Sequence, residues 1–265
     1  MVRFIDVTKV FPNGYIGLES VSFSLEPGEL VYLVGESGAG KTTLMRLLIR
    51  EISPTSGAIY VGEDNILEAP KNWIPQLRRK IGVVFQDYQL IPDRTIHENV
   101  ALVLEIMRVP KEQLLQRVQD VLELVGIPDK QFMFPVQLSG GELQRAAIAR
   151  ALVTAPGVLF ADEPTGNLDP DTGKGIMELL KKVQDLGTTV LIATHDQLAL
   201  EKFPSRQIHM KQGKVIDDSV PHKKAAKKET KKDADNDSKA DKDEKKSDKP
   251  DSDKSAKKEP EDARD

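Results

Sequence analysis

Apolar and polar positions alternate in the first third of the chain in the way that strands require. Three segments rich in β-branched residues are predicted to be strands, namely Arg3 to Val10, Val21 to Leu25 and Glu29 to Val34. The last one leads directly into a glycine-rich segment, GESGAGKTT, and a helix is expected from about Lys41 to Arg50. Two more strands are predicted at Ile59 to Val61 and Ile81 to Phe85, with a short helix, Trp73 to Arg79, between them.

From Thr95 to Gly126 the apolar spacing changes to three and four residues, which predicts two amphipathic helices. These helices define a helical subdomain over about residues 87–152. Strand and helix patterns then alternate again through Val158 to Ala161, Thr172 to Leu186, Val190 to Ala193 and Gln207 to Met210. Such alternation is typical of a mostly parallel sheet with helices on its faces. We therefore predict one α/β domain over residues 1–220.

After about Pro221 the chain consists almost entirely of Lys, Asp, Glu, Ser and Ala. Without large apolar side chains such a segment cannot offset its ordering entropy, so we predict a disordered charged tail over residues 221–265. Its opposite charges are interspersed, which favours a solvated tail, with weak binding to a partner or a membrane surface as the alternative. The net charge of the whole chain is −4, which gives nucleic-acid binding no support.

The absence of cysteine excludes disulfides, thiolate metal sites and cysteine nucleophiles. It fits a reducing compartment. No apolar run approaches the roughly 18 to 20 residues that span a bilayer, and the first residues do not have the profile of a signal peptide. We expect a cytoplasmic protein, held at a membrane only through a partner.

The glycine-rich segment fits the phosphate-loop pattern G-x-x-x-x-G-K-T and stands where that pattern works, after a strand and before a helix. Its backbone N–H groups and the helix N-terminus can bind phosphates, Lys41 can reach them, and the Thr42 hydroxyl can ligate Mg²⁺. The predicted nucleotide-binding residues here are Gly35, Glu36, Ser37, Gly38, Ala39, Gly40, Lys41, Thr42 and Thr43. The alternative is an ordinary glycine-rich turn.

A pair of carboxylates follows the apolar strand Val158 to Ala161. At the end of that strand Asp162 is suited to the Mg²⁺ shell, and the adjacent Glu163 is suited to orienting and activating the attacking water. Alone, the pair could simply open a turn before Pro164. Together with a phosphate loop it predicts an enzyme that hydrolyses a bound nucleotide.

The segment Leu138 to Glu142, LSGGE, resembles the signature motif of the ABC ATPase family and precedes an Ala-rich helix, LQRAAIARAL. A serine hydroxyl and glycine N–H groups at a helix N-terminus make a second anion seat, suited to a γ-phosphate, formed by Ser139, Gly140, Gly141 and Glu142. Unless the two seats adjoin, one phosphate cannot occupy both in one subunit. We therefore expect a two-fold dimer with shared sites. A plain helix cap is the alternative.

Other residues acquire roles from this resemblance, which covers residues 1 to about 217. His195 in VLIATHD resembles the switch histidine that contacts the γ-phosphate, and Gln86 resembles the glutamine that joins Mg²⁺ or the attacking water to the subdomain. Asp169 corresponds to the loop that links the two sites of the dimer. The family fold also implies an N-terminal antiparallel β-subdomain. An aromatic ring normally stacks on adenine in this family, and we choose Phe11 over Tyr15 from its distance to the phosphate loop.

The stretches VVFQDYQLIPDRTIHENV, QLSGGELQRAAIARAL and ADEPTGNLDP most resemble the cell-division branch of the family. One departure is Glu142, where many members have glutamine. The resemblance implies that a homodimer binds FtsX-like integral membrane subunits at the cytoplasmic face of the plasma membrane and so controls cell-wall hydrolysis. The coupling helix of such a partner is expected in a cleft near Gln86 that includes Trp73 and Tyr88, although Trp73 could equally belong to a core.

Three alternatives come from other classes of protein. The ATPase of a lipoprotein or macrolide exporter shares most of these motifs. A soluble ABC ATPase acting on DNA or ribosomes would usually have a coiled-coil insertion or a second cassette, and neither is found in this sequence. A scaffolding role would predict a damaged site, yet Lys41, Asp162, Glu163 and His195 are all in place.

Overall fold

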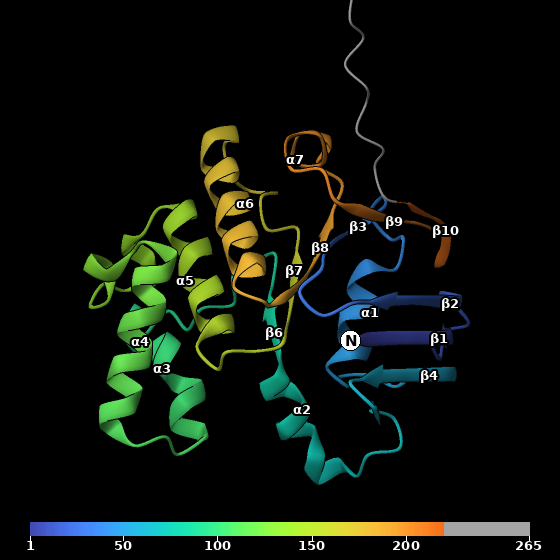
Figure 1. Ribbon diagram of the computed structural model, residues 1–265, viewed down its shortest axis with the longest axis horizontal. Coiled ribbons are helices and arrows are strands. Elements are labelled where there is room, and N and C mark those ends of the chain that lie inside the picture. Colours follow the sequence, from blue (N-terminus) through green and yellow to red (C-terminus); the bar gives the residue numbers. More distant parts are fainter. Residues whose placement is uncertain (220–265) are drawn as a thin grey trace, which may run out of the picture. The chain divides into compact units, whose positions relative to one another are not determined.

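The computed structural model describes residues 1–219, and within them the strands form two sheets (Figure 1). A four-stranded antiparallel sheet has the order β2-β1-β4-β5, and a six-stranded sheet has the order β10-β9-β3-β8-β7-β6. The strands are β1 Val2–Val10, β2 Ile16–Leu25, β3 Leu30–Val34, β4 Ser56–Val61, β5 Asp64–Asn65, β6 Ile81–Val84, β7 Val158–Asp162, β8 Thr189–Thr194, β9 Arg206–Lys211 and β10 Lys214–Ser219.

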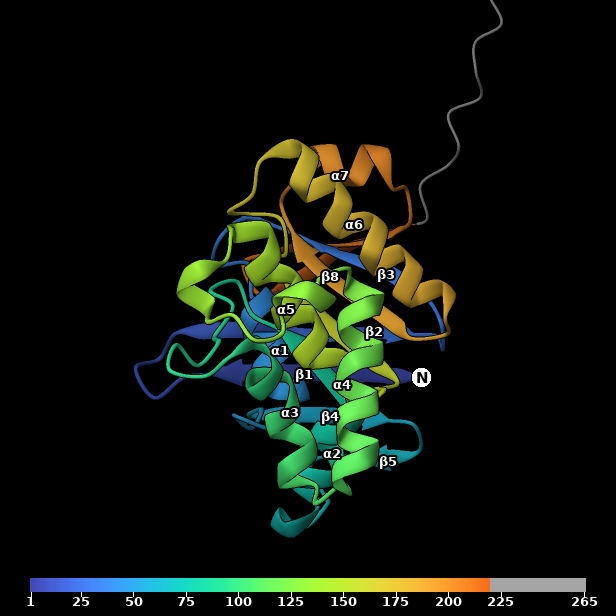
Figure 2. The same cartoon turned by 90° about the vertical axis from the view of Figure 1, so that its left-hand side faces the viewer.

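Helices lie on both sides of the larger sheet, with α3, α4 and α5 grouped together beyond β6 (Figures 1 and 2). Short 3₁₀ turns precede α2 and connect α4 to α5. The helices are α1 Lys41–Leu48, α2 Ile74–Lys80, α3 Ile96–Ile106, α4 Lys111–Val125, α5 Gly140–Leu152, α6 Pro170–Asp185 and α7 Gln197–Lys202, and the 3₁₀ turns are η1 Lys71–Trp73, η2 Pro128–Lys130 and η3 Pro135–Gln137.

The central strands β3, β7 and β8 are buried along their whole length and are apolar except at the ends of β7 and β8, because both of their faces are covered. Successive side chains of β3 point to opposite faces, so that Tyr32 belongs to the core shared with the helical layer, whereas Val31 and Leu33 belong to the core shared with α1 and the antiparallel sheet. The period of two therefore divides the buried residues into two cores that meet at this sheet.

Parallel pairing aligns the carboxyl ends of β3, β8 and β7. Val34 pairs with Thr194, and Asp162 pairs with Ala193. The residues that follow these strands therefore emerge at one edge of the sheet, which is the usual position of a ligand site in an open α/β sheet. This edge receives the phosphate loop, the two carboxylates and His195.

Most of the predicted elements are confirmed, including the mostly parallel sheet and the N-terminal antiparallel sheet. The second strand begins at Ile16 rather than Val21, because pairing with β1 extends it past exposed residues that lack a strand pattern. Three short elements, β5, α7 and β10, were not predicted, since none of them has enough apolar positions to show a period. The predicted tail, residues 221–265, lies outside the described residues.

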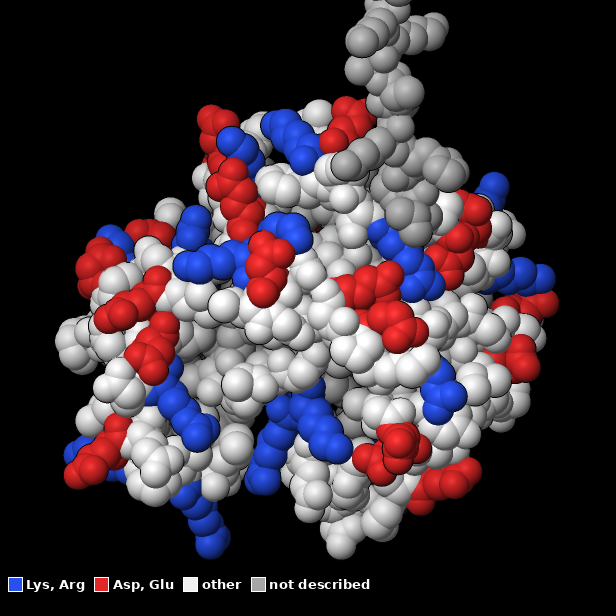
Figure 3. Space-filling model, viewed as in Figure 1, with Lys and Arg blue, Asp and Glu red and all other residues white. Residues whose placement is uncertain are grey.

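None of the helices in residues 1–219 combines the length and the apolar character that crossing a membrane requires. On the face shown in Figure 3, acidic and basic side chains are interspersed. That face of the described part of the molecule does not present the continuous basic stripe that tracks a nucleic-acid backbone.

The buried side chain of Asn99 stabilises the loop between β6 and α3 through hydrogen bonds to its backbone. It is fully buried, and its amide nitrogen lies 2.9 to 3.0 Å from the carbonyl oxygens of Ile91, Arg94 and Thr95, among which its two N–H groups are shared. Its side-chain oxygen accepts from the Ile91 N–H at 2.7 Å. One side chain thus serves three backbone groups of the loop that follows Gln86, namely the Ile91 N–H and the carbonyl oxygens of Ile91 and Arg94.

We expect Asn99→Ala to lower the free energy of unfolding by about 2 to 4 kcal/mol, because buried backbone groups lose their partners. Urea denaturation measures this change. Gln113→Ala on the exposed face of α4 is the control and should stay within about 0.5 kcal/mol of the parent. Equal stability of the two variants would contradict the bracing role of Asn99.

Candidate functional site

The predicted phosphate loop connects β3 to α1, and two of its glycines are required by close packing. Gly40 has a φ of 109° and caps α1, and a Cβ there would lie 2.7 Å from Leu18 Cδ2 and 2.9 Å from the Gly17 carbonyl oxygen. A Cβ on Gly35 would lie 2.6 Å from the Met210 carbonyl oxygen. The backbone can follow this path only where side chains are absent.

Lys41 starts α1, and its side chain is nearly buried, with 7% of the residue exposed. Its ammonium group donates to the carbonyl oxygens of Gly35 at 2.6 Å and Glu36 at 3.3 Å, and it lies 3.4 Å from Glu163 Oε1. A buried cation is stable only when it is paired and hydrogen-bonded. The loop therefore holds a positive charge at the place predicted for phosphates.

Thr42 and Asp162 join α1 to the end of β7. The Thr42 hydroxyl donates to Asp162 Oδ2 at 2.9 Å. Burial raises the pKa of Asp162 above its ordinary value, with a smaller contribution from the neighbouring Glu163, while the Thr42 hydrogen bond and Lys41 oppose this rise. The two oxygens that were predicted to ligate Mg²⁺ thus lie side by side.

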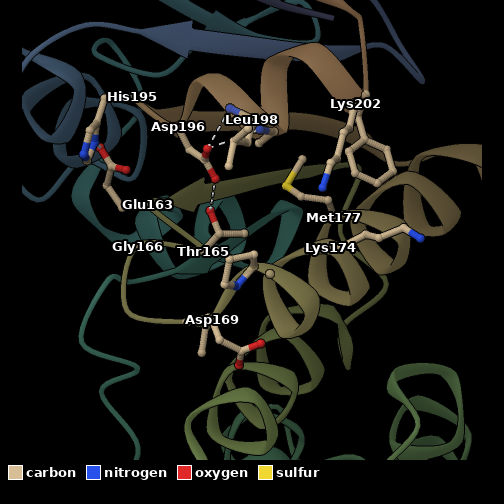
Figure 4. Close-up of a pocket in the computed structure, with 15 residues that line it drawn as sticks. Glu163, Thr165, Gly166, Asp169, Lys174, Met177, His195, Asp196, Leu198 and Lys202 are labelled. Carbon is tan, nitrogen blue, oxygen red and sulfur yellow. Dashed lines mark hydrogen bonds and ion pairs between the residues drawn. The ribbon is translucent and has the colours of Figure 1, made fainter. Parts of the chain in front are cut away.

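Glu163 is the point at which three functional side chains meet. Its Oε1 lies 2.8 Å from His195 Nδ1 and 3.4 Å from the Lys41 ammonium. Figure 4 shows Glu163 and His195 together at one end of a pocket that extends past Thr165 toward α6. The backbone of Glu163 has a φ of 48°, which is unfavourable for this residue type and common at functional sites.

A cavity of about 470 Å³ lies over these groups. It is lined by most of the predicted site residues together with one unexpected ring, namely Tyr15, Glu36, Ser37, Gly38, Ala39, Gly40, Lys41, Thr42, Thr43, Gln86, Asp162, Glu163 and His195. Gly35 does not line it and contributes its carbonyl oxygen to Lys41 instead. The phosphate loop, the carboxylates, Gln86 and His195 therefore form one site.

The structure places Tyr15, and not Phe11, on the wall of this cavity. Phe11 packs over Gly17, where a Cβ would lie 2.6 Å from the Phe11 ring, and it stacks on Tyr15 with the ring centroids 6.0 Å apart. The choice of Phe11 over Tyr15 therefore has no support in this geometry. Both rings were visible in the sequence, but only the fold shows which one turns toward the loop.

The signature residues form the N-terminus of α5 and are not among the residues lining the phosphate-loop cavity. Ser139 and Glu142 make a capping box, in which each side chain accepts a hydrogen bond from the backbone of the other. A Cβ on Gly141 would lie 2.4 Å from Thr172 Cγ2, so α5 packs closely against the start of α6. Asp169 caps α6 and lines the pocket of Figure 4 together with Glu163.

A family model described as ABC transporter matches residues 18–166, which is more than half of the chain. The chain belongs to the ABC transporter family.

Comparison with individual proteins shows which branch of the family this chain is similar to. The cell division ATP-binding protein FtsE of Streptococcus pneumoniae is 46% identical over 218 residues, covering 82% of this chain and 95% of that protein. FtsE of Bacillus subtilis is 44% identical over the same length, with 82% and 96% covered. The match with FtsE confirms the predicted resemblance to the cell-division branch of the ABC ATPases.

Solved structures agree with the fold. The dimeric ABC transporter cassette MJ0796 has a TM-score of 0.76 at 36% identity, covering 83% of this chain and 98% of that one. A second structure of that cassette, in a post-hydrolysis state with ADP and phosphate, has the same score at 35% identity and the same coverage. This chain is an ATPase of the same fold, as the ordered motifs predicted.

Arg150 is a residue of this ABC ATPase that no motif singled out. It lies near the end of α5 and donates to the carbonyl oxygens of Gln89 and, at 2.8 Å, of Tyr88. Tyr88 and Gln89 have φ values of 61° and 50°, so Arg150 holds two consecutive residues in an unfavourable conformation, starting two positions after Gln86. Arg150 lies within an ordinary helical pattern, so the sequence offers no signal for this contact.

We expect Asp162→Asn to raise the melting temperature of the nucleotide-free protein at pH 7. The folded state raises the pKa of this carboxyl, so the unfolded chain loses the proton first, and stability falls as pH rises from the ordinary carboxyl value through the raised one. At pH 7, above the ordinary carboxyl pKa, the burial of Asp162 therefore opposes folding, and an amide, which carries no charge, removes this effect.

Thermal unfolding at pH 7 measures the melting temperature of this variant without nucleotide and the increase that ATP and Mg²⁺ cause. The same variant should lose the added stability that ATP and Mg²⁺ give to the parent protein. A lower melting temperature of the nucleotide-free variant would contradict the burial penalty at Asp162.

Proposed function

We propose that this chain is the ATP-hydrolysing subunit of an FtsEX-like membrane complex in bacterial cell division. The convergence of Lys41, Glu163 and His195 on one cavity, in a chain similar to FtsE over nearly all of FtsE's length, supports this proposal most directly. In this proposal residues 1–220 form the nucleotide-binding domain, with the helical subdomain over about residues 87–152.

Phosphates would bind to the backbone N–H groups of Gly35 to Thr43 and to the Lys41 ammonium. Lys41 is already desolvated, so its charge acts on an anion through a medium of low dielectric constant. Tyr15 on the wall of the cavity, with Phe11 stacked behind it, would be the place for adenine, where stacking contributes about 1 to 3 kcal/mol.

The residues present fit a magnesium ion. Thr42 and Asp162 offer two adjacent oxygens, and Gln86 lines the same cavity. Residues 1–219 do not contain a cluster of three or more acidic or histidine side chains suited to a metal ion, so phosphate and water oxygens would have to complete the shell, as is usual for Mg²⁺. The ion would neutralise charge on the phosphates when it is bound.

Hydrolysis would rest on Glu163 as the group that orients and activates water. Its carboxylate contacts both Lys41 and His195, which places it between the phosphate loop and the switch histidine. His195 is exposed and lines the cavity, and it would contact a γ-phosphate through Nε2, since Nδ1 lies against Glu163. Gln86 would join the attacking water to the subdomain. These are the assigned catalytic residues.

A head-to-tail homodimer follows from the separation of the two anion seats. Ser139, Gly140, Gly141 and Glu142 do not share the cavity of the phosphate loop, so they would complete the site of a second copy. The dimeric form of the similar cassette MJ0796 supports such an arrangement. Asp169, next to the Glu163 pocket, would connect the two sites.

The membrane partner would bind a groove of about 310 Å³ between α2, the β6 edge, α3 and α5. Arg78, Phe85, Gln89, Val103 and Arg150 are among its lining residues. The lining residues do not include Trp73, which packs against the core of the antiparallel sheet, or Tyr88, which packs against the helical core, so the proposed groove differs in these two rings from the cleft expected from the sequence. An FtsX-like integral membrane protein seated there would hold the dimer at the cytoplasmic face of the plasma membrane.

We expect Glu163→Gln to dimerise when ATP and Mg²⁺ are added, because phosphate binding survives while water activation is lost. Lys41→Ala is the matched control and should remain monomeric, since it lacks the buried cation of the phosphate loop. Sedimentation velocity distinguishes the two species, and the ATPase rate of both variants should fall by at least about 100-fold.

A different result would count against the shared site. If Glu163→Gln stays monomeric at saturating ATP, both alone and with the FtsX-like membrane subunit in detergent, the two-fold arrangement is wrong. If Lys41→Ala dimerises as well, dimerisation does not depend on phosphate binding.

A further inference from the structure

The signature motif of this chain contains a carboxylate at the point where an anion is expected to bind. Glu142 is the third residue of α5, and its Oε2 accepts hydrogen bonds from the Ser139 N–H and the Ser139 hydroxyl, both at 2.8 Å. A capping box works with glutamate or glutamine at this position. The negative charge of Glu142 is therefore not needed for the cap, and it would repel a γ-phosphate.

Lys130 supplies the opposite charge. Its ammonium lies 3.2 Å from Glu142 Oε1, on the carboxylate oxygen that the capping box leaves free. The two side chains are about equally half-buried, with 29% and 28% exposed, so solvent screens the pair only in part. The pKa of Lys130 is raised by this contact first and by Asp129 second, which keeps the lysine charged.

Backbone hydrogen bonds hold Lys130 in place. It ends the 3₁₀ turn Pro128–Lys130, its N–H donates to the Ile127 carbonyl oxygen at 3.1 Å, and its own carbonyl accepts from Met133 at 2.9 Å. The same segment is fastened to the start of α3, where Ile96 N–H donates to Met133. Asp129 also contacts the ammonium at 3.3 Å but is 69% exposed, so Glu142 is the better-shielded partner.

We propose that Lys130 is a positioning residue of the signature motif, which cancels the charge of Glu142 so that Ser139, Gly140 and Gly141 can receive the γ-phosphate of ATP held by a second copy of this chain. The inference rests on the shared-site dimer proposed above. It assigns a function to a residue that lies outside every motif recognised in the sequence.

The test measures the dissociation constant of the ATP-bound dimer by sedimentation equilibrium, in full-length protein carrying Glu163→Gln. Lys130→Ala should weaken this dimer about fivefold, which corresponds to a half-exposed ion pair, and Lys130→Arg should restore it. With Glu142→Gln also present, Lys130→Ala should cause no further loss, because the charge that the lysine cancels is gone while the capping box remains.

Lys214→Ala is the matched control, because Lys214 forms an ion pair with Glu19 at 2.8 Å in another part of the protein. It should leave the dimer unchanged. Melting temperatures of all variants, measured without nucleotide, separate a loss of folding from a loss of association.

The outcomes are distinct. If Lys130→Ala weakens the dimer equally with and without Glu142→Gln, the proposal is overturned, because the lysine then acts independently of the carboxylate. A dimer that Lys130→Ala does not weaken would also overturn it and leave the shared site standing. A failure of Glu163→Gln itself to dimerise would remove the shared site, and this proposal with it.

Discussion

Parallel pairing of β3, β8 and β7 is the constraint on which the rest of the site depends. The register fixes Val34 beside Thr194 and Asp162 beside Ala193, so three loops begin at the same height. A slip of one residue would turn every side chain of a strand to the opposite core, which the two apolar faces oppose. The contacts among Lys41, Glu163 and His195 are therefore a consequence of core packing far from the cavity.

The charged groups at this edge of the sheet lower the stability of the nucleotide-free protein. Lys41 is nearly buried against two carbonyl oxygens and a carboxylate, Asp162 has a raised pKa, and Glu163 has an unfavourable backbone conformation. Proteins often keep such strain at functional sites, where a bound ligand relieves it. In the nucleotide-free protein the ammonium of Lys41 is instead held by the Gly35 and Glu36 carbonyl oxygens and by Glu163.

The sequence predicted the parts of the structure that have a strong period or a short, specific motif. The central strands, the amphipathic helices, the phosphate loop and the Asp162–Glu163 pair all belong to this group, because their signal lies in neighbouring residues. Contacts between distant segments leave no such signal, and these include the turn of Tyr15 toward the loop, the hydrogen bonds from Arg150 to Tyr88 and Gln89, and the Lys130–Glu142 pair. The elements β5, with 2 residues, and α7, with 6 residues, were missed because so few positions cannot show a period.

Arg150 and Ser139 stand near opposite ends of the same helix. With 13 residues, α5 is about 20 Å long, too short to bend appreciably without a break in its hydrogen bonds. One end is tied to the backbone beside the groove, and the other is the cap of the signature motif. A displacement of one end of this rigid helix would therefore be accompanied by a displacement of the other end, so that the groove and the cap of the signature motif are mechanically connected.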